Sequence, residues 1–297
     1  MKSIKIFISI IFFSLVVISC GNQDNSNIVN VVAKDYYFES PDSIASGWTT
    51  FNLKNEGTCV HFFYLTFLPD SATFQMYLKD IGGAFAIDLD SLQAGMDKAS
   101  AGALLGSLLP KWYASAKAMG GVGLISPGKT AQTTIKLEPG NYVMECYMKT
   151  KDGKFHSELG MIKPLTVTDK VSKMKEPMNA NVDVSLSNYK IESNGKLSAG
   201  KNRIAVHFKE HPKYGLGNDV HIVKLNNNTN IDRLTKWMDW MNIDGLRTPA
   251  PAEFLGGVQE MPVGFTAYFT VDLKPGNYAF ISESPVANKM FERFTIN

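Results

Sequence analysis

The feature that most constrains the fold of this chain is an internal repeat. Residues 266–278, TAYFTVDLKPGNY, match residues 130–142, TAQTTIKLEPGNY, with Thr, Ala, Thr, Leu and Pro-Gly-Asn-Tyr in the same places. Two shorter pairs follow the same order: YYFES at 36–40 with YKIES at 189–193, and VHFFYL at 60–65 with VHIVKL at 220–225. Repetition on this scale predicts two domains of one fold in a chain of 297 residues.

The segments between the turn residues of both halves have the composition of β-strands. In the first half, residues 28–33, 36–38, 48–53 and 59–68 are rich in Val, Ile, Phe, Tyr and Thr, and Pro41 and Gly47 interrupt them. Short strands that recur every eight to twelve residues are typical of a β-sandwich. The sequence therefore predicts a mainly β protein.

Residues 70–126 break this strand pattern. Asp70-Ser71 and Asp90-Ser91 can each cap a helix, and residues 110–119 have the composition of a third helix. We expect a helical insertion over about residues 70–126 that covers one end of the first sandwich. In the second half we expect a single helix over residues 230–242.

The predicted organisation follows from these patterns. It comprises a signal peptide (1–19), a flexible tether (20–27), a first domain (28–169), a charged, Pro-containing linker (170–181) and a second domain (182–297).

The N-terminus has the features of an export signal. Lys2 and Lys5 precede an apolar run at residues 6–18 that is too short to span a bilayer comfortably. The following Ser19-Cys20-Gly21 completes a segment that resembles a bacterial lipoprotein lipobox. That resemblance implies a lipidated Cys20 and an extracytoplasmic, membrane-anchored protein of the bacterial cell envelope, in the periplasm or at the outer membrane. The alternative is an ordinary signal peptide with an incidental cysteine.

The charge of the chain excludes one class of partner. Without Lys2 and Lys5 the chain has 28 basic and 28 acidic residues, and no run of five or more Lys or Arg occurs. A basic surface for nucleic-acid binding is therefore not expected.

One loop contains three side chains that bind soft metals. Cys146, His156 and Met161 follow a predicted strand, and a thiolate, imidazoles and a weak thioether are the ligands of trigonal copper sites. A single loop cannot surround the ion alone, so a second imidazole from another strand is required. His61 is the candidate for that ligand.

The order of these residues resembles the cupredoxins, the plastocyanin, azurin and pseudoazurin group. Asn55 and Gly57 match the family's Asn-x-Gly turn six residues before the first His ligand, and Pro-Gly-Asn-Tyr precedes Cys146 as in the family. His-x4-Met is kept at His156 and Met161. The resemblance implies two tandem cupredoxin-like Greek-key β-sandwiches, with copper held in the first by His61, Cys146, His156 and Met161.

The spacing between Cys146 and His156 departs from the family, because nine residues separate them instead of two to four. The extra segment contains Asp152-Gly153, which indicates a hairpin turn. A hairpin can return His156 to Cys146 and preserve the metal site, or it can carry His156 away so that the metal site is lost. The sequence leaves both outcomes open.

The second half lacks the full ligand set. Ser282 stands where the first half has Cys146, and the segment 284–291 has no His. His221, opposite His61, and Met290 are the remaining candidates there, so a blue copper site is not expected. We predict a structural role or a binding surface for this half, and a solvated surface position for His207.

Two main functions follow. The first is a lipid-anchored copper protein that transfers single electrons to a redox partner protein. The second is a metal-free cupredoxin-like lipoprotein that acts as an interaction module. In that alternative, Cys59, which is two residues from His61, forms a disulfide with Cys146.

Catalysis is not expected. The chain has no nucleophile elbow, no His-Glu-x-x-His motif and no phosphate-binding glycine loop. Its five His residues are also too few for a multicopper oxidase.

Overall fold

A computed structural model describes residues 27–187, 189–212, 217–283 and 290–297. The predicted signal peptide, Cys20 and the tether up to residue 26 lie outside the described residues. None of the described helices is long and apolar enough to cross a membrane.

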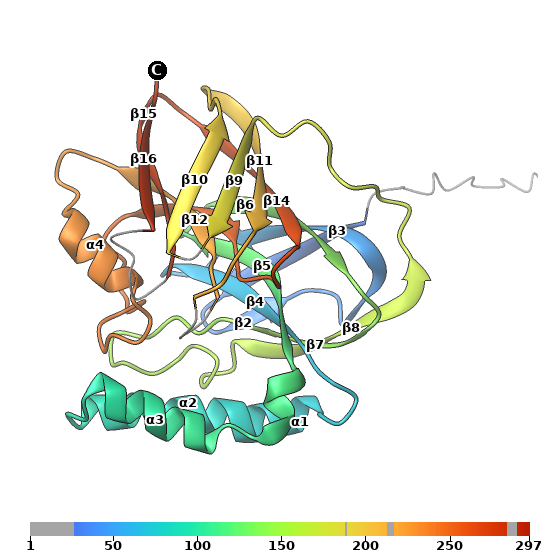
Figure 1. Ribbon diagram of the computed structural model, residues 1–297, viewed down its shortest axis with the longest axis vertical. Helices are drawn as coiled ribbons and strands as arrows, with labels where there is room; N and C mark the ends of the chain where they lie inside the picture. The colour runs from blue at the N-terminus through green and yellow to red at the C-terminus, as the bar shows by residue number, and fades with distance from the viewer. Residues whose placement is uncertain (1–26, 188, 213–216, 284–289) are drawn as a thin grey trace, which may run out of the picture.

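The described strands form one continuous sheet that folds into two facing layers, called the two sheets below, because β3 pairs with β6 in one layer and with β8 in the other (Figure 1). The first half contributes β1 (Ile28–Lys34), β2 (Tyr37–Glu39), β3 (Ser43–Asn55) and β6 (Thr130–Leu137) to one sheet and β4 (His61–Phe67), β5 (Lys117–Ile125), β7 (Gly140–Glu145) and β8 (Ile162–Val171) to the other. The second half contributes β9 (Val182–Ser187), β10 (Lys190–Gly195), β11 (Gly200–Phe208) and β14 (Thr266–Leu273) to the first sheet and β12 (Val220–Leu225), β13 (Glu253–Val258), β15 (Gly276–Ile281) and β16 (Phe291–Ile296) to the second. The mainly β class predicted from the sequence is confirmed.

The two halves pair their strands in the same way. β1 runs parallel to β3 as β9 does to β11, and β3 pairs antiparallel with β6 as β11 does with β14. In the other sheet, β4 lies between β5 and β7 as β12 lies between β13 and β15. The pairs β6–β14 and β5–β13 join the halves, so both sheets continue from one half into the other.

The repeated Pro-Gly-Asn-Tyr forms the same turn in each half. The Tyr142 hydroxyl donates to the backbone oxygen of Glu138 over 2.8 Å, and the Tyr278 hydroxyl donates to that of Lys274 over 2.9 Å. Both tyrosines are buried, so the phenol oxygen needs such a partner.

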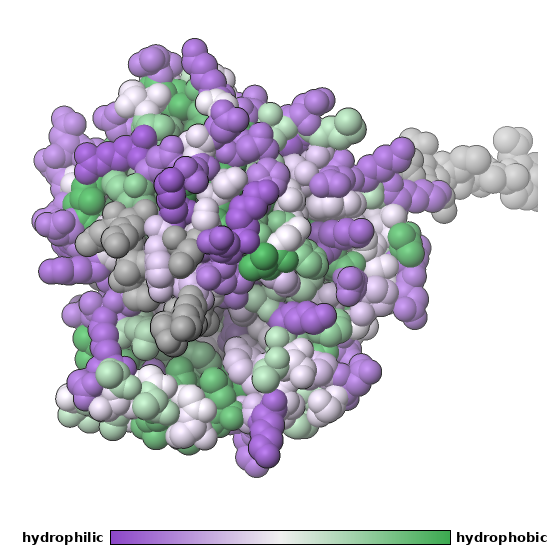
Figure 2. All heavy atoms as spheres, in the orientation of Figure 1, coloured by the Kyte–Doolittle hydropathy of each residue, from purple (hydrophilic) through white to green (hydrophobic). Residues whose placement is uncertain are grey.

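The helical insertion predicted for the first half is present. It contains α1 (Phe74–Met76), the π-helical turn η1 (Tyr77–Gly82), α2 (Gly83–Gln93), α3 (Lys98–Leu108) and the 3-10 turn η2 (Lys111–Ser115). Thr73 caps α1 and Asp97 caps α3 through side-chain oxygens that accept backbone N–H groups. These helices form a layer across one end of the sheets, and Figure 2 shows mainly apolar and pale surface there, where Ile87 and Leu108 are exposed.

Three details of the predicted insertion are wrong. Thr73 and not Asp70-Ser71 caps the first helix. Asp90 lies inside α2 and does not start a helix, and residues 110–119 form η2 and the start of β5 instead of a third helix. Gly121 allows β5 to lie close to β4, because a Cβ at this position would lie 2.0 Å from the Phe63 carbonyl oxygen of β4. Close strand pairing therefore overrides the helical composition of the preceding residues.

The helix predicted in the second half is also present, as α4 (Ile231–Met238), which ends earlier than expected. Asn230 caps it by accepting the backbone N–H of Arg233. Leu234, Trp237 and Met238 are buried on one face.

Candidate metal centre

A buried asparagine positions the first candidate ligand. The Asn55 side chain donates to the backbone oxygens of Cys59 and Ile125, each over 2.8 Å, and accepts the N–H of Gly57 over 2.9 Å. These bonds fix the loop that leads into β4, whose first residue is His61. The Asn-x-Gly turn therefore has a structural cause in this chain.

A hairpin brings the second imidazole back to the thiol. Thr150 N–H donates to Lys154 O over 2.8 Å, and His156 N–H donates to Met148 O over 2.8 Å. The hairpin prediction is confirmed, and of the two outcomes that the sequence left open, the structure has the one that returns His156 to Cys146.

The second half of the chain anchors the hairpin through two basic side chains. The buried Lys149 ammonium donates to the backbone oxygens of Trp240 over 2.7 Å and Asn242 over 2.8 Å. Arg247 donates from two guanidinium nitrogens to Lys151 O over 2.9 and 2.6 Å. The second half thus has a structural role at the site of the first.

Three donor atoms converge between the two sheets of the first half. Cys146 Sγ lies 3.9 Å from His61 Nδ1 and 3.7 Å from His156 Nδ1, and all three side chains are fully buried. Metal bonds of about 2.3 Å to sulfur and about 2.0 Å to nitrogen, set about 120° apart, separate their donor atoms by about 3.7 Å. Each of the two sulfur–nitrogen separations is close to this value, so the Cys146 sulfur lies at the distance from each imidazole Nδ1 that a shared ion requires.

Asp35 fixes the tautomer of His61. His61 Nε2 lies 2.6 Å from Asp35 Oδ1, and Thr58 donates its N–H and its hydroxyl to Asp35 Oδ2 over 2.9 and 2.6 Å. Partial burial raises the pKa of Asp35, but the hydrogen bonds from Thr58 and His61 outweigh it and lower the pKa to about 2. A carboxylate at Nε2 keeps the proton there and leaves Nδ1 free to bind a metal.

A second thiol lies on the other side of the imidazole pair. Cys59 Sγ is 3.7 Å from His61 Nε2 and 3.9 Å from His156 Nε2, and the three side chains offer ligand atoms within 4.8 Å of one another. Because His61 Nε2 donates its proton to Asp35, this face lacks one of the required lone pairs. The Cys146 face is therefore the better metal site.

Both thiols are free in the structure, so the disulfide of the metal-free alternative is not formed there. Burial, followed by the charge of Asp35, raises the pKa of Cys59 to about 12. Burial raises the pKa of Cys146 above its ordinary range as well. A thiolate at Cys146 therefore requires a cation beside it, since a coordinating thiol is deprotonated by its metal.

The imidazole of His156 is held in its neutral form. Burial and the neighbouring His61 lower the pKa of His156 to about 3, and the Tyr36 ring packs edge-on against it at 4.7 Å. A neutral imidazole is the metal-binding form.

Met161 joins the two ligand segments through its backbone. Its N–H donates to His156 O over 2.9 Å, and its carbonyl accepts the N–H of Cys146 over 3.0 Å. The side chain is fully buried in the same core as Cys146. The described donor set of thiol, two imidazoles and thioether can bind copper.

The equivalent place in the second half is closed to a metal. His221 Nδ1 accepts the backbone N–H of Leu124 over 3.1 Å, so the ring proton is on Nε2, which lies 3.1 Å from both Asp219 Oδ2 and Glu283 Oε1. Ser282, opposite Cys146, donates to Asp219. Although Asp219, His221 and Glu283 have the spacing of metal ligands, neither ring nitrogen has a free lone pair.

Several of these residues were not predicted from the sequence. Asp35 and Lys149 stand in no motif, whereas Asp219-Val-His221 parallels Cys59-Val-His61 and could have indicated the second cluster. His207 also differs from its predicted solvated position, because it is partly buried and contacts Asp183 over 2.9 Å and Thr266 over 3.0 Å.

No protein-family model matches the chain, and no curated protein sequence matches it. Among solved structures it is similar to the dithionite-reduced auracyanin of Roseiflexus castenholzii (18% identity, 48% of this chain, 98% of that chain, TM-score 0.27) and to auracyanin A, a "blue" copper protein of Chloroflexus aurantiacus (18% identity, 48% and 98%, TM-score 0.28). A multicopper oxidase is similar over more of the chain (12% identity, 91% and 88%, TM-score 0.25). At these TM-scores the donor geometry, and not the similarity, supports a function for this chain.

Proposed function

We propose that this chain is a copper-binding electron carrier whose metal is held by His61, Cys146, His156 and Met161. The observation that carries the proposal is the separation of 3.7 and 3.9 Å between the Cys146 sulfur and the two imidazole Nδ1 atoms. Copper supplies one-electron chemistry when it is bound by such a donor set. The chain's own residues provide the fixed, buried surroundings.

The surroundings suit electron transfer because hydrogen bonds and burial hold the donor side chains in place. Asp35 locks the orientation of His61, the anchored hairpin locks His156, and the donor side chains are fully buried. A site that is rigid and dry stays in one geometry in both oxidation states, and its potential is set by burial and by the axial sulfur.

The wider proposal follows from the sequence. The signal at residues 1–19 and Cys20 support a lipid-anchored protein on the extracytoplasmic side of a bacterial membrane, with a redox protein as partner. The internal repeat and the matching strand pairings support a tandem duplication in which the first copy, residues 28–169, holds the metal and the second, residues 182–297, holds the hairpin. We propose that the chain carries electrons and is not itself a catalyst.

The proposal is tested by metal content and redox cycling of the full chain. Reduced protein is loaded with Cu(II) without oxygen, and bound copper is measured after removal of the excess. We expect one copper per chain, reversible one-electron reduction, and no oxygen consumption with artificial electron donors. Protein that retains no copper with both thiols reduced would contradict copper binding. Several coppers per chain together with oxygen turnover would identify an oxidase instead of a carrier.

A further inference from the structure

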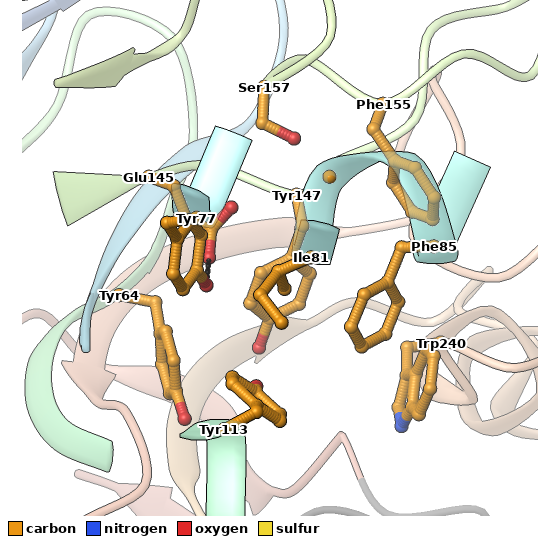
Figure 3. Close-up of a pocket in the computed structure, with 11 residues that line it drawn as sticks. Tyr64, Tyr77, Ile81, Phe85, Tyr113, Glu145, Tyr147, Phe155, Ser157 and Trp240 are labelled. Atoms are coloured by element: carbon orange, nitrogen blue, oxygen red, sulfur yellow. Dashed lines mark hydrogen bonds between the residues drawn. The ribbon is translucent and has the colours of Figure 1, made fainter. Parts of the chain in front are cut away.

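A second feature of the first half is an aromatic pocket between the helical insertion and the β4–β7 surface. Figure 3 shows seven aromatic side chains around it: Tyr64, Tyr77, Phe85, Tyr113, Tyr147, Phe155 and Trp240. They come from β4, the insertion, the hairpin and the second half of the chain. Segments distant in sequence therefore build one aromatic enclosure.

The pocket is separate from the metal centre although it shares two chain segments with it. Glu145 and Tyr147, on either side of Cys146, line the pocket, and Phe155 and Ser157 do so on either side of His156. The Cys146 sulfur and the His156 ring lie at the donor cluster, 3.7 Å apart, whereas these four neighbours line the pocket.

One carboxylate faces this aromatic enclosure. The Tyr77 hydroxyl donates to Glu145 Oε1, and within the described residues the Glu145 carboxylate has no further hydrogen bond and no ion pair with Lys, Arg or His. No Lys, Arg or His lines the pocket, although Lys149 Nζ lies 5.7 Å from the centroid of the Phe155 ring. Figure 3 shows the carboxylate beside Tyr77. The pocket thus has one acceptor oxygen without a protein partner.

These groups define the chemistry of a ligand. The faces of aromatic rings carry partial negative charge and attract cations, most strongly when water is excluded, and the Glu145 oxygen beside them is a hydrogen-bond acceptor. An anion would meet repulsion from both. We propose that this pocket binds a small organic cation, an alkylammonium group whose apolar substituents contact the rings while its charge faces Glu145.

The test compares a cation with a neutral molecule of the same shape. Choline and 3,3-dimethylbutan-1-ol, in which carbon replaces the nitrogen, are titrated into the metal-free full chain by isothermal calorimetry. We expect choline to bind at least about 10-fold more tightly than the alcohol, since both the rings and the carboxylate favour the charge. Equal affinities, or no binding of either molecule, would overturn the proposal.

Two variants locate the binding. Glu145→Gln keeps the shape and should weaken choline about 10-fold without changing the affinity for the alcohol. Phe85→Leu removes one ring and should weaken choline about threefold or more. The matched control is Glu138→Gln, an exposed acid in the turn before β7, which should leave choline affinity unchanged. An effect of Glu138→Gln as large as that of Glu145→Gln would also overturn the proposal, because it would show general charge attraction.

The calorimetric measurement needs no copper, so its result is independent of copper binding. Absence of choline binding would leave the copper proposal intact, and choline binding would not depend on it. Circular dichroism of each variant checks that the fold is retained. A folded Glu145→Gln protein that binds choline as tightly as the natural chain would contradict the role of the carboxylate.

Discussion

The imidazole of His61 donates from Nε2 to Asp35 Oδ1 over 2.6 Å, and this contact decides which side of the ring faces a metal. With the proton on Nε2, the free lone pair of Nδ1 points toward the Cys146 sulfur, 3.9 Å away. The same contact keeps the proton on Nε2, so Nε2 has no lone pair for a metal on the Cys59 side. One carboxylate thus selects between two thiols.

Removal of that carboxylate should weaken metal binding. Asp35→Ala frees Nε2 and lets the ring change its tautomer and orientation, so we expect copper affinity to fall about 10- to 100-fold. Competition with a copper chelator measures the affinity. Asp42→Ala is the matched control, because Asp42 is exposed and pairs with Lys163 over 2.8 Å away from the donors. Equal losses in the two variants would contradict the role of Asp35.

The hairpin turn should be needed for copper binding and not only for stability. Gly153 has a φ of +84°, and Gly264 has a φ of +89° in a turn of the second half. Replacement of either glycine by Ala should cost about 1–2 kcal/mol of unfolding free energy, because the left-handed backbone is strained for other residues. Only Gly153→Ala should also lower copper affinity. Denaturant unfolding and chelator competition separate the effects, and a loss of affinity in Gly264→Ala alone would contradict the prediction.

The anchor of the hairpin should make stability depend on pH. Burial, partly offset by Asp239 and Asp88, lowers the pKa of Lys149 from 10.5 to about 7. Between these values the unfolded chain binds a proton at Lys149 that the folded chain does not, so the contribution of Lys149 to the unfolding free energy should rise with pH, by at most about 1.4 kcal/mol per pH unit. Burial opposes it, but Asp219 and Glu283 raise the pKa of His221 to about 9, so His221 contributes with the opposite sign below that pH. Lys149→Met should therefore remove the rising contribution and make the pH slope less positive than that of the natural chain. Urea unfolding of the metal-free protein at several pH values from about 7 to 10 measures it, and identical slopes would refute it.

The second half should not become a copper site when its missing thiol is supplied. Ser282→Cys places a thiol opposite Cys146, but Leu124 N–H still occupies His221 Nδ1 and the two carboxylates still hold Nε2. In a Cys146→Ser background, we therefore expect this variant to remain colourless with Cu(II). The visible spectrum checks this outcome. An intense band in the double variant would show that the second cluster can rearrange around a metal.

The fold was predictable from the sequence because its signals are local or repeated. The Pro-Gly-Asn-Tyr repeat marks the same turn in both halves, where Tyr142 and Tyr278 bond to the backbone four residues earlier. The predicted helix at residues 110–119 was wrong at its end because Lys117 and Ala118 pair with Phe67 and Thr66 of β4, and such long-range pairing is not visible in the local sequence period.

The proposed ligands could be named from their motif, but the residues that position them could not. Asp35 lies 26 residues before His61 on a different segment, and the hydrogen bonds of the Lys149 ammonium go to backbone oxygens of the second half. A hydrogen bond to a backbone oxygen does not depend on the residue type of the partner, so the sequence does not indicate it. The nine-residue gap between Cys146 and His156 could be resolved only by the hairpin's own hydrogen bonds.

The central claim is that Cys146, and not Cys59, is the copper thiolate, and one spectrum tests it most directly. Cys146→Ser and Cys59→Ser proteins are reduced, loaded with Cu(II) without oxygen and compared in the visible range. We predict an intense thiolate-to-copper charge-transfer band in Cys59→Ser and its complete loss in Cys146→Ser. A band that survives in Cys146→Ser and disappears in Cys59→Ser would contradict the account.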